Sequence, residues 1–176
     1  MGGRQAGSTF KPFLYTLAMQ EGYTPCYKVP NVPQTFMNQD STWTPRSGSK
    51  RYEGRMVTLK WGLANSVNNI SAWLVKQFPP QTIIDDVIKK MGVKSFIMPV
   101  NSIIFGTSDV SLYEMVGAYS TYANKGVYIE PIFVTRIEDK NGNILTTFQP
   151  KQNEAISEKT AYLMLSLLKG VVNRGT

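Results

Sequence analysis

Apolar residues recur at helical spacing along most of this chain, whereas the strand-like period of two is confined to residues 132–148. There, two alternating segments, 132–138 and 143–148, flank Asp139-Lys140-Asn141-Gly142. An Asn-Gly pair between two such segments is typical of a tight hairpin turn. The pattern therefore predicts a mainly α-helical chain with a single β-hairpin at about 132–148.

Residues that start, stop or interrupt helices divide the rest of the chain. Pro12 is tolerated only near a first turn, so we expect the first helix to begin at or just after Ser8. A second helical pattern covers 59–76 with an interruption near 65–69. Residues 23–56 show no clear period and are predicted to form a long loop.

Capping residues predict three further helices. They are a helix opened by Thr82 and Asp85 that ends at 91–92, one opened by Ser111 and Glu114 that ends near 124, and one opened by Ser157 that covers 160–169 and stops at Gly170.

The 176 residues include no histidine and a single cysteine, Cys26. A Ser-His-Asp triad, a Cys-His pair and a histidine zinc helix are therefore excluded, and an internal disulfide is impossible. We expect no metal and no cofactor. Any proton acceptor for covalent chemistry has to be Lys, Asp, Glu or Tyr.

The chain is basic, with 19 Lys and Arg against 12 Asp and Glu and a net charge of +7. Most of the excess lies in one segment, at Arg46, Lys50, Arg51, Arg55 and Lys60. We interpret it as a solvated basic loop, with attraction to an anionic polymer as the alternative. No secretory leader is visible, and the longest apolar stretch, 162–172, is too short to span a bilayer, so the chain is expected to be soluble.

Ser8 and Lys11 form a candidate nucleophile and base. At a helix start, residues three apart lie on one face, about 5–6 Å between Cβ atoms, so a buried lysine amine could activate the serine without histidine. The alternative is ordinary: serine often caps helices, and most lysines are solvated. Ser47 and Lys50 repeat the same spacing in a loop, which shows how easily it arises by chance.

Ser66 and Asn68 are a weaker candidate pair. The serine hydroxyl could relay a proton, and the asparagine amide could hold a substrate carbonyl. The alternative is that both are polar residues at a helix break, where Asn65 and Asn69 also lie.

The segment Gly7-Ser8-Thr9-Phe10-Lys11-Pro12-Phe13 resembles the first catalytic motif of penicillin-binding proteins, specifically of the class A peptidoglycan transpeptidases. Leu63-Ala64-Asn65-Ser66-Val67-Asn68 is similar to the family's second motif, S-x-N. Other blocks resemble the family in the same order along the chain. They lie at 21–25, 43–45, 52–54, 57–59, 105–115, 122–128, 135–139 and 168–176.

This resemblance implies an α+β protein with the penicillin-binding transpeptidase/β-lactamase-like fold. It also implies that Ser8 attacks the carbonyl between the last two residues of a D-Ala-D-Ala stem peptide and that Lys11 takes its proton. Ser66 would relay a proton to the leaving amine, and Asn68 would hold the substrate's amide. An amine of a neighbouring stem would then resolve the acyl-enzyme into a cross-link.

The partners implied are stem peptides, an acceptor amine and β-lactams, which would acylate Ser8 and stay bound, with no nucleic acid. No E-x-x-L-N element like that of a class A β-lactamase is present, so rapid hydrolysis is not expected. The parent protein would be membrane-anchored and act in the periplasm, at the extracytoplasmic face of the bacterial cytoplasmic membrane.

The sequence also departs from the family pattern. It contains no K-[ST]-G third motif, Ser111-Leu112 stands where Pro-Leu is common, and residues 46–51 are more basic than the pattern. We therefore expect residues 1–176 to be one partial transpeptidase domain, mostly helical, lacking most of the central sheet and any glycosyltransferase domain. In isolation it is expected to be inactive or nearly so.

Two alternatives remain at this point. One is a penicillin-recognising sensor or serine β-lactamase-like domain, which shares the first motif. The other is a binding module without catalysis, in which the basic and aromatic loop at 43–61 grips nucleic acid or a wall polymer. Steep loss of binding with salt would be its signature.

Overall fold

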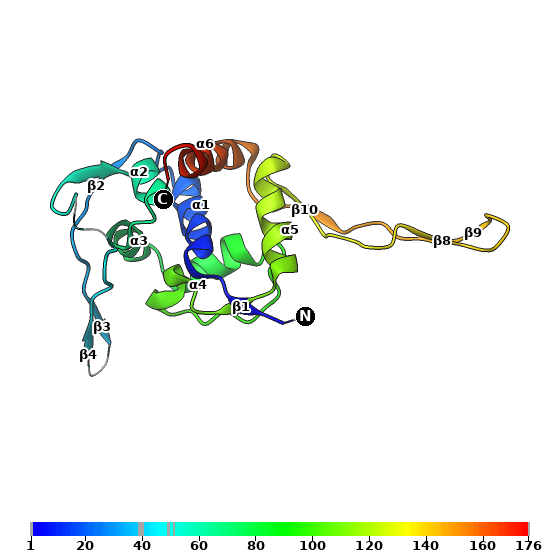
Figure 1. The fold of residues 1–176 in the computed structure, drawn as a ribbon, viewed down its shortest axis with the longest axis horizontal. Coiled ribbons are helices and arrows are strands. Elements are labelled where there is room, and N and C mark those ends of the chain that lie inside the picture. Colours follow the sequence, from blue (N-terminus) through cyan, green and yellow to red (C-terminus); the bar gives the residue numbers. More distant parts are fainter. Residues whose placement is uncertain (1, 39–40, 49, 51, 176) are drawn as a thin grey trace.

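The computed structural model describes residues 2–38, 41–48, 50 and 52–175. Helix α1 lies at the centre of the body, and the other helices are arranged around it (Figure 1). In chain order the helical elements are η1 (Gly7–Phe10), α1 (Lys11–Gln20), α2 (Leu59–Ala64), α3 (Asn68–Val75), α4 (Pro80–Ile83), η2 (Ile84–Ile88), η3 (Asn101–Phe105), α5 (Leu112–Ala123) and α6 (Glu158–Arg174).

The strands of the described part form five separate antiparallel pairs, with no sheet of more than two strands. The pairs are β1 (Arg4–Gln5) with β6 (Asp109–Val110), β2 (Lys28–Pro30) with β5 (Met56–Thr58), β3 (Phe36–Asn38) with β4 (Ser41–Trp43), β7 (Val127–Ile129) with β10 (Gln152–Glu154), and β8 (Arg136–Glu138) with β9 (Ile144–Thr147). The last two pairs follow each other along one ribbon, the hairpin arm (residues 127–154), which projects from the body (Figure 1).

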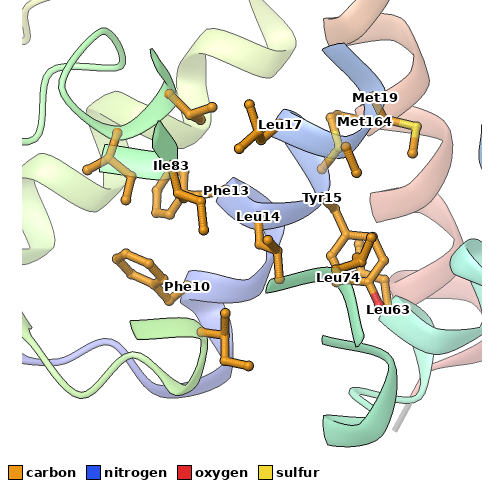
Figure 2. Close-up of a cluster of buried hydrophobic side chains, with 14 of the residues drawn as sticks. Phe10, Phe13, Leu14, Tyr15, Leu17, Met19, Leu63, Leu74, Ile83 and Met164 are labelled. Atoms are coloured by element: carbon orange, nitrogen blue, oxygen red, sulfur yellow. The ribbon is translucent and has the colours of Figure 1, made fainter. Parts of the chain in front are cut away.

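Helix α1 is buried on all sides, since every residue from Lys11 to Met19 is buried. Most of its buried residues are apolar, as in a core helix, and Figure 2 shows side chains of this helix packed among those of the surrounding helices. Phe10 and Phe13 meet edge to face, 5.2 Å between ring centroids. Pro12 lies in the first turn of α1, as predicted.

Several local predictions are confirmed. The helical pattern at 59–76 is broken between α2 and α3, and the hairpin turn lies at Asp139-Gly142 between β8 and β9, with strands shorter than predicted. Ser111 and Glu114 form the predicted capping box at the start of α5. Partial burial alone would raise the pKa of Glu114, but hydrogen bonds from Ser111, Ser95 and the Lys94 N–H lower it to about 2.

Three predictions were wrong in detail. The segment 23–56 is not only loop, since β2, β3 and β4 lie within it and β5 begins at its last residue. The capping box of Thr82 and Asp85 does not form. The helical segment already begins at Pro80, and the Asp85 carboxylate instead accepts hydrogen bonds from Gln81 and Lys89.

Gly170 does not stop the last helix, because α6 continues to Arg174. Gly170 is buried where α6 packs on α2, and a Cβ at this position would lie 3.2 Å from Cε of Lys60. The glycine thus permits a close helix contact, and tertiary packing overrides its usual role as a helix stop. No helix in the described residues is long and apolar enough to cross a bilayer.

Candidate active site

Ser8 lies on the 3₁₀ turn η1, directly before the buried helix α1, and its side chain is exposed. The N-cap positions of η1 and α1 are occupied by Ala6 and Phe10, and neither makes a side-chain capping hydrogen bond. Ser8 lies inside η1 and is therefore not an N-cap serine. Its Oγ instead accepts a hydrogen bond from Ser66 Oγ at 3.0 Å. The ordinary capping alternative for Ser8 is therefore not what the structure shows.

Lys11, one turn further along, is 1 % exposed. Its Nζ donates to Ser66 Oγ at 2.9 Å, to the Ser66 carbonyl at 2.6 Å and to Asn68 Oδ1 at 2.7 Å. Each of these acceptors is a neutral oxygen. Burial of the amine, which disfavours its charged form, lowers the pKa of Lys11 from 10.5 to about 8.

Ser66 occupies the turn between α2 and α3 in a left-handed conformation, with φ of 50°. This region costs a residue with a Cβ roughly 1–2 kcal/mol. The turn is held by hydrogen bonds from Ser66 N to Leu63 O and from Val67 N to Gly62 O, at 3.0 and 2.9 Å. The strained backbone places the Ser66 hydroxyl between Lys11 and Ser8, and such strain is often found at functional sites.

Asn68 is the first residue of α3, and both ends of its carboxamide are used. Oδ1 accepts from Lys11 Nζ, and Nδ2 donates to the carbonyl oxygen of Arg46 at 2.8 Å. The amide therefore connects the lysine to the basic loop between β4 and β5.

The structure thus brings together all four residues singled out in the sequence, although more than 50 positions separate Lys11 from Ser66. The hydrogen-bonded route from the Lys11 amine to Ser8 passes through Ser66. Both hydroxyls can rotate to donate or accept, so this route can carry a proton from Ser8 to an uncharged Lys11. The repeat of the spacing at Ser47 and Lys50 lies in the loop between β4 and β5, outside any helix of the described residues.

Two residues that support the Ser8 turn were missed in the sequence. Gly106, with φ of 62°, accepts a hydrogen bond from Gly7 N at 3.2 Å, and Tyr119 Oη donates to the Thr9 carbonyl at 2.6 Å. A Cβ on Gly106 would lie 2.3 Å from the backbone N and O of Gly7. Nothing in the local pattern marks either contact, because each joins segments about 100 residues apart.

The aromatic rings of the 43–61 segment are engaged within the protein. Trp43 packs edge to face on Phe105, 5.6 Å between centroids, and Trp61 packs on Tyr52 at 5.0 Å. The packing of these rings does not favour a stacking surface for nucleic acid. Among the described residues, no group of three or more His, Cys, Asp or Glu side chains could hold a metal ion.

Comparisons of the sequence with family models, with curated proteins and with solved structures all point to the same family. The family model described as the penicillin binding protein transpeptidase domain matches residues 2–176. Penicillin-binding protein 1A of Neisseria lactamica is 31% identical over 182 residues, which cover 98% of this chain. The match spans only 23% of that relative, so this chain corresponds to less than a quarter of its length.

Solved structures show the same fold. Penicillin-binding protein 1A from Haemophilus influenzae superposes with a TM-score of 0.87 at 22% identity, covering all of this chain and 30% of that one. The imipenem acyl-enzyme complex of penicillin-binding protein A from M. tuberculosis gives a TM-score of 0.83 at 19% identity, covering 97% of this chain and 44% of that one. The predicted fold is confirmed: a transpeptidase fold whose helical part is present here with short strand pairs.

Proposed function

This chain belongs to the penicillin-binding protein transpeptidase family, and from that membership we propose that it supplies the acylating serine of a peptidoglycan D,D-transpeptidase. The single observation that carries the assignment is the line of polar atoms from the buried Lys11 amine through Ser66 to the exposed Ser8. A desolvated lysine beside a hydroxyl is one of the few ways to activate serine in a chain without histidine.

In the first half-reaction, Ser8 Oγ attacks the carbonyl carbon between the two terminal D-alanines of a stem peptide. The Ser8 proton passes through the Ser66 hydroxyl to the uncharged Lys11 amine. The N–H of Ser8, at the start of η1 where helical N–H groups lack partners, would donate to the developing oxyanion. The C–N bond then breaks, and the proton returns through Ser66 to the nitrogen of the departing D-alanine.

In the second half-reaction, an amine of a neighbouring stem peptide attacks the ester on Ser8. Its proton moves to Lys11 as the new amide forms, and it returns to Ser8 when the C–O bond breaks. Asn68 holds the substrate amide during both steps through the second N–H of its carboxamide, since the first is donated to the Arg46 carbonyl. A β-lactam would open on Ser8 in the same way, but its leaving nitrogen stays attached, so the acyl-enzyme persists.

Residues 1–176 would then be part of one transpeptidase domain of a membrane-anchored bacterial protein that acts in the periplasm. The 176 residues contain no Lys-Thr-Gly or Lys-Ser-Gly triplet, which in the family supplies a second oxyanion donor. Loss of one such donor lowers rates by about 100- to 1,000-fold. The 176-residue chain alone is therefore expected to be inactive or nearly so.

Labelling with a fluorescent penicillin tests the assignment, using the natural protein that contains these residues at its full length. We expect one label per molecule in the wild type, on the peptide that carries Ser8, and no label in Ser8→Ala. Ser47→Ala is the matched control, since Ser47 has the same spacing to a lysine. Labelling that survives Ser8→Ala, or that is lost in Ser47→Ala, would contradict the assignment. Rapid turnover of nitrocefin would favour a β-lactamase instead.

A further inference from the structure

The turn that carries Ser8 is held on both sides by elements that are distant in sequence. Before Ser8, Gly7 N donates to the Gly106 carbonyl at 3.2 Å. After it, Tyr119 Oη donates to the Thr9 carbonyl at 2.6 Å. We propose that Tyr119 is a positioning residue for acylation, whose hydroxyl holds the Thr9 carbonyl and so fixes the orientation of Ser8. The inference rests on the proposed transpeptidase function and adds to it a residue outside the catalytic cluster.

Pro12 removes one local partner of the Thr9 carbonyl. In a 3₁₀ turn each carbonyl accepts from the N–H three residues further along, and Lys11 N donates in this way to Ser8 O. The next carbonyl in the series is that of Thr9, whose partner would be the N–H of residue 12. Proline has no N–H, so this bond cannot form. The Tyr119 hydroxyl supplies a donor from another helix instead, and a tertiary contact thereby fixes the turn.

The ring of Tyr119 is held so that its hydroxyl reaches this carbonyl. It packs edge to face on Phe13 of α1 and on Tyr122 of α5, with centroid distances of 6.1 and 5.8 Å. Both neighbouring rings are fully buried, so the ring between them has little room to move. Burial raises the pKa of Tyr119 to about 12, and the hydroxyl therefore keeps its proton and remains a donor between pH 7 and 9.

The helix that carries Tyr119 is itself firmly attached to the body. At the start of α5, the Glu114 carboxylate accepts hydrogen bonds from Lys94 N and Ser95 N at 2.9 and 2.8 Å, in addition to those of its capping box. These bonds join the first turn of α5 to a segment about 20 positions earlier. Tyr119 thus connects a fixed helix to the Ser8 turn.

This connection should act on the chemical step rather than on binding. The Ser8 side chain is exposed, and its Oγ meets the proton route at Ser66 Oγ, 3.0 Å away. The direction of that Oγ depends on the backbone of the turn. Loss of the Tyr119 hydroxyl would release the side of the turn that follows Ser8. A small displacement of a nucleophile slows bond formation even when the ligand still binds in the same place.

Tyr119→Phe tests the inference, because it removes the hydroxyl and keeps the ring. Acylation by a fluorescent penicillin is measured in the full-length natural protein as a function of penicillin concentration. We expect the limiting rate constant to fall about tenfold, the effect of one hydrogen bond, with the half-saturating concentration unchanged. The midpoint of the pH profile should stay near the Lys11 pKa of about 8, because the surroundings of the amine are unaltered.

Tyr122→Phe is the matched control. It removes a hydroxyl from the same helix, one that shares a hydrogen bond with Thr16 Oγ1 at 2.8 Å inside the core. Its acylation should match the wild type, while its loss of stability to urea should be at least as large as that of Tyr119→Phe.

Four results would overturn the inference and leave the transpeptidase assignment standing. They are a wild-type limiting rate in Tyr119→Phe, an equal fall in both phenylalanine variants, a change confined to the half-saturating concentration, and a shifted pH midpoint. Labelling that survives Ser8→Ala would overturn the assignment and the inference together.

Discussion

Leu14 and Leu145 are the same residue type in opposite surroundings. Leu14 lies on α1 with no exposed surface, whereas Leu145 lies on the hairpin arm and is 66% exposed. Every residue of α1 from Lys11 to Met19 is buried, while the arm also exposes Phe133 and Ile144. Lys11 belongs to this enclosed helix, and the exposed Ser8 lies on the turn that leads directly into it, so their positions depend on the packing of α1 rather than on the strands of the arm.

Removal of the Ser66 hydroxyl should have the largest effect, because it breaks the only polar route described between Lys11 and Ser8. We expect Ser66→Ala to slow acylation by penicillin about 1,000-fold, within the range for lost proton transfer. Ser66→Gly is the companion variant, since glycine accepts a φ of 50° without strain. It should be as slow as Ser66→Ala but at least as stable to urea. Normal acylation in either variant would remove Ser66 from the mechanism.

The leucine pair tests the packing difference directly. Leu14→Ala should lower the free energy of unfolding by about 2–5 kcal/mol, because it leaves a cavity in the core. Leu145→Ala should change it by less than about 0.5 kcal/mol, as for other exposed positions. Urea unfolding followed by circular dichroism measures both. Equal losses would show that the arm is as much a part of the cooperative unit as α1.

Alanine substitutions at two glycines with left-handed backbones distinguish the effect of backbone strain from the effect of a steric contact near Ser8. Gly106 and Gly142 have φ of 62° and 84°, but only at Gly106 would a Cβ meet other atoms, those of the Gly7 backbone. Gly106→Ala should displace the Ser8 turn and slow acylation by about 100-fold, in line with the cost of small misplacements of reacting groups. Gly142→Ala should lower stability by roughly 1–2 kcal/mol and leave acylation unchanged. Equal acylation rates in the two variants would show that the Gly106 contact does not position Ser8.

Local signals in the sequence were sufficient for the main elements. Asn141-Gly142 marked the hairpin, Ser111 and Glu114 marked the start of α5, and the pattern at 59–76 marked the break that carries Ser66. Each depends on neighbours within a few residues, where turn and capping chemistry act directly.

Contacts between distant segments could not be predicted in this way. The approach of Gly106 to Gly7, the hydrogen bond from Asn68 to the Arg46 carbonyl and the packing of Lys60 over Gly170 depend on the assembled fold. The same holds for the burial of Lys11, since its spacing from Ser8 indicated a pair but not a desolvated amine. The resemblance to penicillin-binding proteins indicated the role of Lys11 as the base for Ser8, which the spacing of the two residues alone left open.

The pH dependence of Ser8 acylation tests the central claim, that a desolvated Lys11 is the base. With a pKa of about 8, the uncharged fraction of Lys11 rises from about one tenth at pH 7 to about nine tenths at pH 9. The rate constant for penicillin acylation should therefore rise about tenfold over this interval and then level off. Lys125→Gln, which removes a lysine whose side chain is 78% exposed, should give the same profile. A rate that is constant between pH 7 and 9, or that keeps rising with a midpoint near 10.5, would contradict the claim.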